Sequence, residues 1–469
     1  MSEAIEEPAR VTHLVAAPTV AVVGAGSAGV AAAISAAEMG APTMLIEATG
    51  SVGGTLVNQL LESSAGFHDT RRLAVVGGIG QRLIDRLQRY GGSPGHVPDH
   101  TGYSGMRVPV NHTELALCEA VVLGEAGVRV LLNGAVVGVQ MVGNRVVALV
   151  LDGMAGRMAV RPQVVVDCSG DADVAALAGS SFQLDAPDAR QPASLLFKLG
   201  GLDFERLLEY ARGHPEDFRK GSEVPGPDMP NVHMWGFGML MARAHAAGLL
   251  ELRRKELHLS GWPARGEAVI NVTRTPASPL DPEWRGDALP LLSRQVLQMA
   301  RFFRECVPGG ENSYVAGVAT SIGVRESRRI LGEYTLTEQD ARSGMTFPDS
   351  IARCGFPLDV HDNKGLSLTY AESLPSAFDI PYRCLVPKRS ANMLVAGRPI
   401  STTHVANGST RQTAQCFATG EAAGVAAALC WERGCQPRAL AIEPLRQALR
   451  DRGVVLERAG RVSETGGTR

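Results

Sequence analysis

The hydrophobic positions of this chain fall into short, wholly apolar runs separated by helix-like stretches. Residues 20–23, VAVV, are apolar and β-branched without alternation, which is typical of a strand buried on both faces of a parallel sheet. A glycine-rich turn and an alanine-rich helix to about Met39 follow, and a second apolar run, TMLIE, ends at Glu47. Apolar runs recur at 164–166 and 392–398, so the pattern predicts an α/β protein with strands from both ends of the chain.

Two other stretches show different periods. Residues 127–153 alternate apolar and polar positions between turn residues, which predicts a β-meander. Residues 75–87, VVGGIGQRLIDRL, imitate a nucleotide-binding turn but lack its third glycine. We interpret them as the start of an amphipathic helix.

The turn after the first strand carries the pattern G-x-G-x-x-G. Gly24 permits the tight turn into the helix, Gly26 lets a pyrophosphate approach the backbone, and Gly29 lets helix and strand pack closely. Glu47, 18 residues after Gly29, is placed to accept hydrogen bonds from an adenosine ribose, and its charge disfavours a 2′-phosphate. The motif alone is weak, but the strand, helix, second strand and acid follow in order. The sequence therefore predicts a dinucleotide site that does not take NADP.

A second glycine pair, Gly53-Gly54, followed by Thr55, favours FAD over NAD. An NAD-binding domain does not require these residues, whereas FAD domains of the glutathione-reductase type place a glycine-rich turn here, beside the flavin half of the cofactor. The order of a βαβ unit, a meander, and an apolar strand that runs into Gly170-Asp171 is also the plan of such FAD domains. No second complete dinucleotide fingerprint and no C-x-x-x-x-C redox pair near residue 55 is found.

Composition limits the class of protein, its partners and its compartment. The chain has 469 residues, 45% hydrophobic and 20% charged, with a formal net charge of −2, which is typical of a globular protein without a nucleic-acid or anionic-membrane footprint. Its eight cysteines form no C-x-x-C pair, which argues against a zinc site and favours a reducing, cytoplasmic setting. The uncharged stretch 19–37 is long enough to span a membrane, but three glycines interrupt it and an acidic segment precedes it.

Several motifs together resemble a family of FAD-dependent oxidoreductases with an arginine-rich motif and a C-terminal A-G-R block. The matching stretches are VVGAGSAGVAAAISAAEMG, VDCSGDADVAALAG, IGVRESRRILGEYTLT, FPDSIARCGFPLDVHD and the long segment 380–428. The chain departs from the family pattern at Cys168, where a small alanine is expected, and in the run GGTLVNQ after Gly53.

The resemblance implies a discontinuous architecture. It predicts a Rossmann-like FAD-binding domain of the glutathione-reductase type, built from residues 17–180 and 389–440, with an α+β substrate or cap domain, 181–388, inserted between them. Residues 1–16 and 459–469 are expected to be flexible tails.

The resemblance also implies which residues hold the cofactor. The last strand of the FAD domain returns to the cofactor, and the helix after it points its N-terminus at the flavin pyrimidine ring, which becomes more negative on reduction. The predicted FAD-binding residues are Gly24, Ala25, Gly26, Ser27, Ala28, Gly29, Glu47, Ala48, Gly53, Gly54, Thr55, Val136, Ser169, Gly170, Asp171, Gly397, Arg398, Ser409, Arg411, Gln412 and Thr413.

Candidate catalytic residues are His404, Arg325 and Arg328. His404 lies in the polar loop before the last major helix, and its ordinary pKa suits proton transfer at neutral pH; it could equally orient substrate or serve structure. Arg325 or Arg328 could bind a substrate carboxylate or carbonyl, whereas the plainer interpretation is an ion pair of Glu326 with one of the neighbouring arginines. We expect no metal site, because His96 and His100 lack an acidic third ligand, and His361 is expected to be a loop histidine.

The function predicted from these residues is hydride transfer between a small polar organic substrate and flavin N5, by a dehydrogenase or an oxidase. The alternatives are a C=C reductase on the same scaffold, a tRNA-modifying FAD protein and a non-catalytic flavin-binding module. Gly397-Arg398 stands where flavin hydroxylases carry Gly-Asp, which disfavours monooxygenation. We expect a small-molecule substrate and an electron acceptor that the sequence does not identify, with no nucleic acid or membrane partner, and the sequence leaves open a homodimer.

Overall fold

The computed structural model describes residues 8–457, except 62, 102, 221, 225, 227 and 363–368. Within these residues, no helix combines the length and the apolar character that a bilayer crossing needs. The predicted tail 459–469 and residues 1–7 lie outside the described part of the chain.

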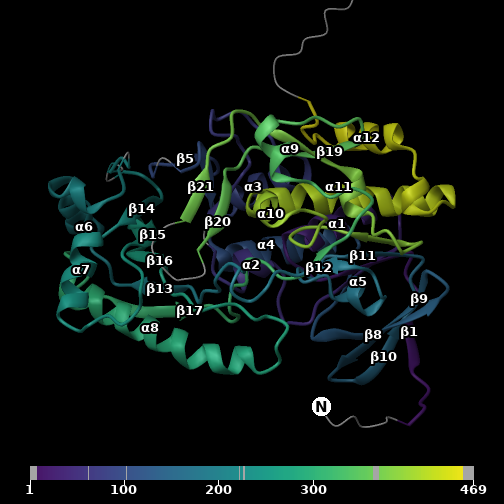
Figure 1. The fold of residues 1–469 in the computed structure, drawn as a ribbon, viewed down its shortest axis with the longest axis horizontal. Coiled ribbons are helices and arrows are strands. Elements are labelled where there is room, and N and C mark those ends of the chain that lie inside the picture. The colour runs from purple at the N-terminus through teal and green to yellow at the C-terminus, as the bar shows by residue number, and fades with distance from the viewer. Residues whose placement is uncertain are drawn as a thin grey trace, which may run out of the picture.

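A five-stranded parallel sheet joins the two ends of the chain (Figure 1). The wholly buried run 20–23 is its central strand, and side chains alternate between the two faces: Val20 and Val22 enter one core, Ala21 and Val23 another. The predicted apolar strands at 20–23, 43–47 and 164–166 are confirmed, and the run 392–398 forms a strand over Met393–Val395. The order is β23 (Met393–Val395), β11 (Val164–Asp167), β2 (Val20–Val23), β3 (Thr43–Ile46) and β7 (Arg129–Leu131).

Two helices rich in small residues cover one face of the sheet. They are α1 (Ser27–Glu38) and α11 (Thr413–Arg433), at opposite ends of the sequence. Their backbones approach closely, because a Cβ added at Gly420 would lie 2.1 Å from the carbonyl oxygen of Ala28 and one at Gly424 2.2 Å from that of Ala32. The glycines of α11 therefore set the distance between the two helices.

The predicted meander covers the other face of the sheet and is confirmed for residues 134–153, whereas residues 129–131 of the predicted range form β7 of the parallel sheet. β8 (Gly134–Val142), β9 (Arg145–Gly153) and β10 (Gly156–Val160) are antiparallel, and their buried residues share a core with those of the parallel sheet. The flexible tail expected over 1–16 is wrong for its last residues: β1 (His13–Ala16) pairs with β10 in parallel, so backbone hydrogen bonds fix this segment.

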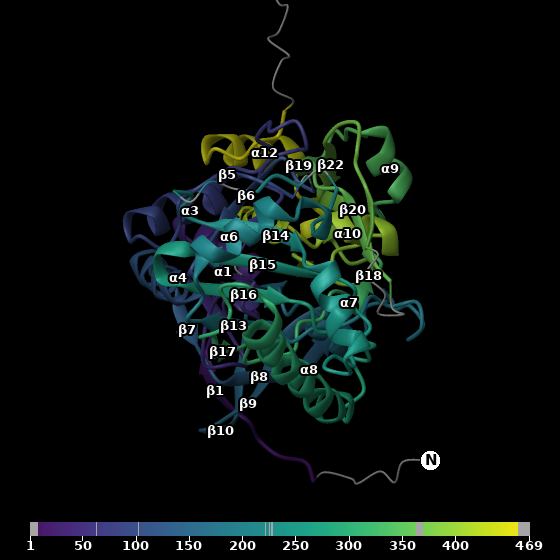
Figure 2. The same cartoon turned by 90° about the vertical axis from the view of Figure 1, so that its left-hand side faces the viewer.

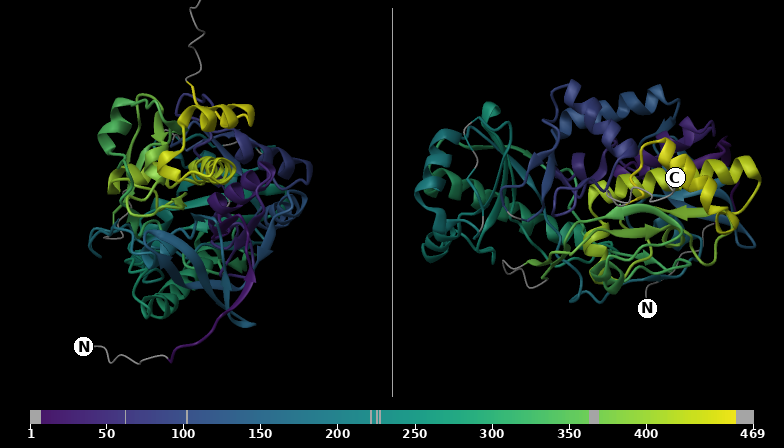
Figure 3. Two further views of the ribbon diagram at one scale, coloured as in Figure 1. Left: turned by 90° about the vertical axis from the view of Figure 1, so that its right-hand side faces the viewer. Right: turned by 90° about the horizontal axis from the view of Figure 1, so that it is seen from above.

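A second hydrophobic core is built from residues 193–322 together with Leu60. Its antiparallel sheet faces the viewer in Figure 2 and lies at the left of the molecule in the right-hand view of Figure 3. The strands run in the order β14 (Val232–Gly236), β15 (Leu257–Trp262), β16 (Glu267–Asn271), β13 (Phe197–Gly200) and β17 (Tyr314–Val318), with helices α6 (Phe204–Gly213), α7 (Gly238–Ala246) and α8 (Trp284–Cys306).

Residues 336–386 join the core of α1 and α11 instead. The hydrophobic cores therefore divide the predicted range 181–388 near residue 325, and the domain boundaries at 180 and 388 stay a prediction. The elements of this segment are α9 (Glu338–Ser343) and two strand pairs, β19 (Ser350–Cys354) with β22 (Phe378–Pro381) and β20 (Leu358–His361) with β21 (Thr369–Glu372). A further pair, β12 (Phe182–Gln183) with β18 (Arg329–Ile330), lies outside it.

The remaining elements complete the first core. The amphipathic helix expected from residues 75–87 is confirmed as α3. The bounds are α2 (Gly54–Val57), α3 (Gly78–Arg89), α4 (His112–Glu125), α5 (Asp173–Leu177), α10 (His404–Thr410), α12 (Ile442–Asp451), β4 (Ser63–Ala65), β5 (Val97–Pro98) and β6 (Met106–Pro109), with 3₁₀ turns at Pro215–Asp217, Pro263–Arg265, Tyr382–Leu385 and Pro437–Ala439.

Candidate functional site

A cavity of about 450 Å³ lies where the two cores meet. Its volume falls within the range of small-molecule and cofactor sites. It brings together segments from both ends of the chain and from residues 193–325. Predicted site residues on its wall are Gly24, Gly26, Ser27, Ala28, Glu47, Ala48, Gly54, Thr55, Ser169, Gly170, Asp171, Arg325, Gly397, Arg398, Arg411, Gln412 and Thr413.

The fingerprint turn presents bare backbone to this cavity. α1 begins at Ser27 without a side-chain cap at Gly26, so amides of its first turn remain available as donors. A Cβ added at Gly26 would meet only the Cα of Gly54, 3.9 Å away, whereas one at Gly54 would lie 2.6 Å from the Cα of Gly26. The two glycine turns therefore stand against each other and leave open space in front of Gly26.

Glu47 is held in place by backbone amides. Its Oε2 accepts a hydrogen bond from the amide of Ala25 at 2.6 Å, and its Oε1 accepts one from the amide of Thr49 at 2.8 Å. Ala25 itself does not line the cavity, so its part is to orient the carboxylate on the cavity wall.

An ion pair ties the turn after β11 to the turn after β23. Arg398 Nη2 donates to Asp171 Oδ1 at 2.6 Å, and its Nη1 donates to the carbonyl oxygen of Val324, also at 2.6 Å. Arg328, which the sequence offered as a substrate ligand, lies outside the cavity wall. Its Nη1 donates to the carbonyl oxygen of Asp171 and to Asp173 Oδ1, which fixes the turn from behind.

The polar segment before α11 differs from the expected loop. Residues 404–410 form the short helix α10, and α11 begins only at Thr413, so Arg411, Gln412 and Thr413 reach the cavity. Ser409 does not, because its hydroxyl donates to the carbonyl oxygens of Phe356 and Pro357 at 3.0 and 2.8 Å. The prediction that Ser409 contacts the cofactor through its hydroxyl is therefore wrong.

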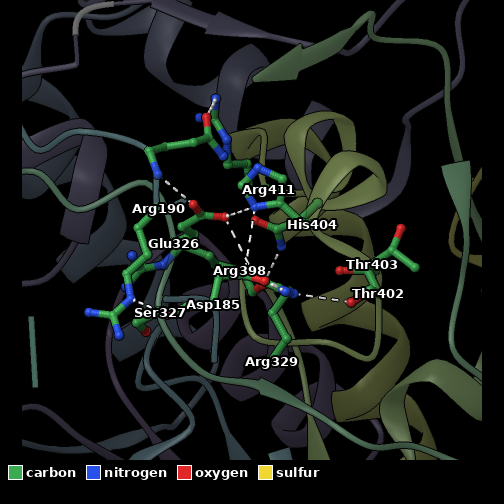
Figure 4. Close-up of polar contacts among 12 residues, drawn as sticks. Asp185, Arg190, Glu326, Ser327, Arg329, Arg398, Thr402, Thr403, His404 and Arg411 are labelled. Carbon is green, nitrogen blue, oxygen red and sulfur yellow. Dashed lines mark hydrogen bonds and ion pairs between the residues drawn. The ribbon is translucent and has the colours of Figure 1, made fainter. Parts of the chain in front are cut away.

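His404 lies in a half-buried ion-pair network around the buried Glu326 rather than on the cavity wall (Figure 4). Its Nδ1 is 2.8 Å from Glu326 Oε2 and 3.4 Å from Asp185 Oδ2. Hydrogen bonding to Asp185 and then to Glu326 raises the pKa of His404 to about 9. The ring is thus protonated at neutral pH and faces two carboxylates, and its predicted catalytic role rests on no described contact with the cavity.

The ligand atoms of Asp185, Glu326 and His404 lie within 4.8 Å of one another, a spacing that could hold a metal ion. Arg329 already supplies a cation to these two carboxylates: its Nη2 is 2.7 Å from Asp185 Oδ2 and its Nη1 is 3.6 Å from Glu326 Oε2. Two cations balance two carboxylates, so we interpret the cluster as an ion-pair network. The ion pair expected for Glu326 with a neighbouring arginine is confirmed, and the arginine is Arg329.

Arg325 reaches the cavity from the other side. Its Nη1 donates to the carbonyl oxygen of Pro192 and to Ser194 Oγ, the latter at 3.0 Å. Burial and then the charge of Arg411 lower the pKa of Arg325 to about 9, so it still carries its charge at neutral pH.

Comparison with known proteins decides the family. The chain matches the family described as FAD dependent oxidoreductase over residues 19–449. It is an FAD-dependent oxidoreductase. The chain is therefore an enzyme of this family, and FAD is its cofactor.

Solved structures with similar folds are more distant, and no curated protein sequence matches the chain. A geranylgeranyl bacteriochlorophyll reductase-like protein from Thermoplasma acidophilum has 13% identity and a TM-score of 0.48, covering 93% of this chain and 82% of that chain. The p-nitrophenol 4-monooxygenase from Pseudomonas putida has 11% identity and a TM-score of 0.46, with coverages of 93% and 85%. A flavin-dependent brominase has 12% identity and a TM-score of 0.45, with coverages of 92% and 83%.

The cavity fits the cofactor of this flavoenzyme family. The open space before Gly26, the uncapped start of α1 and the fixed carboxylate of Glu47 are what a pyrophosphate and a ribose require. Other predicted FAD residues lie off the cavity wall and support it: a Cβ at Gly29 would collide with the carbonyl oxygen of Gly24, Gly53 precedes α2 in a left-handed conformation, and Val136 pairs with Leu151 in the meander.

Sequence reasoning did not assign a further group of residues on the flavoenzyme's cavity wall, most of which come from the second core and from the segment after α2. Several lie inside the motifs that carry the family resemblance but were not singled out there as site residues, and Cys168 was noted only as a departure from the family pattern. The others belong to no motif and come together only when the two cores meet. The missed residues are Thr49, Asn58, Gln59, Leu61, Cys168, Ser194, Leu196, Asn271, Arg285, Ser321, Ile322, Gly323, Val324, Ala396 and Cys416.

Proposed function

We propose that this FAD-dependent enzyme oxidises a small polar organic substrate, as a dehydrogenase or an oxidase. One observation carries the proposal: a single cavity runs from the fingerprint turn to polar side chains of the second core, among them Ser194, Asn271 and Arg325. A cofactor held at the fingerprint end leaves these side chains to face a substrate. FAD, when bound, would supply an acceptor for a hydride, which carries the two electrons of the oxidation.

We assign the cofactor contacts to residues on the first core. The amides of Gly26 to Ala28 are proposed to bind the pyrophosphate, Glu47 the ribose hydroxyls, and the N-terminus of α11 with Gln412 and Thr413 the flavin pyrimidine ring. The five-stranded parallel order with an antiparallel layer on one face supports a glutathione-reductase-type FAD domain. The helix terminus contributes on the order of 0.5–2 kcal/mol to binding a more negative ring.

The remaining roles concern substrate and protons. Arg325 is proposed to hold the substrate, since its planar fork faces the cavity. Oxidation of a C–H bond also releases a proton. His404 remains a proposed acid or base, although it must exchange its proton through Glu326, its nearest carboxylate.

The C=C reductase is a second candidate that one observation favours. Such a reaction needs a proton donor, and His404 is protonated at neutral pH because its pKa is raised to about 9. The two directions can be distinguished by testing which compounds reduce the oxidised flavin and which reoxidise the reduced flavin.

Anaerobic mixing of the FAD-loaded enzyme with candidate metabolites tests the proposal. We expect the visible flavin absorbance to bleach with a polar oxidisable substrate and to return on admission of oxygen or an electron-accepting dye. The proposal is wrong if no alcohol, amine or hydroxy acid bleaches the flavin. If, in addition, the chemically reduced enzyme passes electrons to an unsaturated acid, the enzyme is a C=C reductase.

We also propose the cellular compartment and the partners of the reaction. All eight cysteines are free thiols, which supports a reducing, cytoplasmic compartment. We propose a small-molecule substrate and a separate electron acceptor as the partners, without nucleic acid or membrane, and the oligomeric state stays open.

A further inference from the structure

Two arginines from different segments meet at one serine hydroxyl beside the cavity. Arg274 Nη1 donates to Ser194 Oγ at 2.7 Å, and Arg325 Nη1 donates to the same oxygen at 3.0 Å. Ser194 is buried and lines the cavity, as do Arg325 and Asn271. Arg274 also donates to Asn271 Oδ1 at 2.9 Å, so this cluster is anchored to the cavity wall.

In both guanidinium groups, the hydrogen bonds to described protein atoms come from Nη1. The hydrogen bonds of Arg274 go from Nη1 to Ser194, Asn271 and its neighbour Thr273, and those of Arg325 go from Nη1 to Pro192 and Ser194. In the part of the chain that the structure describes, neither group has a carboxylate partner or a bond from Nε or Nη2. Each arginine therefore keeps the paired donors that bind a carboxylate bidentately.

The neighbouring charges do not balance this pair. Asp359 is the acid whose charge acts on both arginines, but it is already engaged by Arg411, 3.0 Å away, and by His361, 3.3 Å away. The buried Arg254 adds a further cation nearby. Burial lowers the pKa of Arg274 and of Arg325, yet an arginine keeps its proton at neutral pH. The cluster is thus an excess of positive charge at the cavity, in which Arg325 lines the wall and Arg274 is bonded to the wall residues Ser194 and Asn271.

We propose that Arg274 and Arg325, brought together by Ser194, bind a carboxylate group of the substrate. The inference rests on the proposed function and names its substrate class, a small organic acid. FAD is the other source of negative charge, but its pyrophosphate is assigned to the fingerprint turn. A planar carboxylate matches the two free forks, whereas a spherical or tetrahedral anion matches them less well.

A contrast between acetate and acetamide on the FAD-loaded wild-type enzyme tests this without any turnover. The two probes have the same shape and differ in charge. We expect acetate to perturb the flavin spectrum and raise the thermal midpoint saturably, with acetamide inert and with chloride and phosphate at least tenfold weaker at matched ionic strength. Equal effects of acetate and acetamide, or of acetate and chloride, would overturn the carboxylate assignment.

Variants locate the site. Arg274→Gln and Arg325→Gln should each lower acetate affinity at least tenfold while retaining FAD, and Arg274→Lys should fall between, because it keeps the charge but loses the fork. Arg206→Gln is the matched control, since Arg206 lies on the exposed face of α6, which packs on the same core, and pairs with Glu311 at 2.9 Å. Unchanged acetate affinity in both Gln variants, or loss of FAD in place of acetate, would contradict the proposal.

The two proposals fail separately. If acetate binds as described but no organic acid bleaches the flavin, the direction of the reaction is wrong and the carboxylate site stands. If uncharged substrates bleach the flavin and acetate does not compete with them, the enzyme is an oxidase or dehydrogenase and the carboxylate site is wrong.

Discussion

Glu119 is a buried carboxyl group that lies next to the Gly53-Gly54 turn without a hydrogen-bond partner among the described residues. It lies on α4 and is wholly buried. A Cβ added at Gly53 would lie 3.0 Å from its Oε2, so the carboxyl group sits against the Gly53-Gly54 turn. Burial raises the pKa of Glu119 to about 8, and the group is therefore mostly protonated at neutral pH.

Glu119→Gln should stabilise the protein at alkaline pH. The pKa of Glu119 rises from 4.5 to about 8 on folding, so the folded state holds a proton that the unfolded state loses, and wild-type stability falls as pH rises between these values. We expect the variant to gain about 1–4 kcal/mol at about pH 9 and nothing near about pH 5, measured by urea unfolding. A loss of stability at both pH values would mean that the carboxyl group makes a hydrogen bond that the amide cannot.

His404→Asn should act on stability in the opposite direction. The pKa of His404 rises from 6.5 to about 9 on folding, so its contribution is complete below the lower value and is lost as pH rises through the higher one. The variant should therefore be less stable than wild type at about pH 6, with the gap closing above about pH 9. A histidine on the exposed strand β1, His13→Asn, is the control.

The same variant separates a structural from a catalytic histidine. If His404 moves the substrate proton, anaerobic flavin reduction should slow by roughly 10²–10⁴-fold with FAD still bound. An unchanged reduction rate together with the pH-dependent loss of stability would assign His404 to the ion-pair network alone.

At the scale of elements, α1 and α11 depend on glycine for their contact. Gly420 faces the carbonyl oxygen of Ala28, and no side chain fits between them. Gly420→Ala should lower stability by about 1–3 kcal/mol or prevent folding, because the helices must separate. Gly124→Ala on α4, where an added Cβ meets nothing within 4 Å, should be neutral or stabilising by about 0.5–1 kcal/mol. Equal urea midpoints for the two variants would show that the helix contact is looser than described.

At the scale of the whole molecule, the fold and the cofactor impose different demands on the fingerprint. Gly29 is needed by the chain itself, whereas the space before Gly26 is open in the protein. Gly26→Ala should therefore fold with the thermal midpoint of the apoprotein unchanged, yet bind FAD at least about tenfold more weakly, since the methyl group occupies the place of the pyrophosphate. Flavin fluorescence titration measures the affinity. Full flavin content after purification would move the pyrophosphate elsewhere.

Much of the first core could be predicted from sequence because its signals are local. An apolar run such as 20–23 needs burial on both faces, and G-x-G-x-x-G needs a tight turn whatever surrounds it, so four of the parallel strands, the meander over residues 134–153 and the helix after Gly77 appear where they were expected. The fifth parallel strand, β7, lies in the range that was predicted as meander. Conformations that depend on distant partners were not predictable. The strand β1 exists because β10 lies beside it, and the hydroxyl of Ser409 turns away from the cavity because two carbonyl oxygens accept from it.

By itself the sequence determined the cofactor class and its binding turn, since each glycine there answers a steric requirement within a few residues. Tertiary structure decided which side chains meet at the end of the cavity that we propose for the substrate. Arg274 and Arg325 are far apart in the chain and become a pair only because Ser194 lies between them. It also decided that Glu326 and Asp185 hold His404 away from the cavity wall. Charge pairing depends on distances of a few ångströms, and folding brings these groups together from segments whose spacing in sequence carries no trace of it.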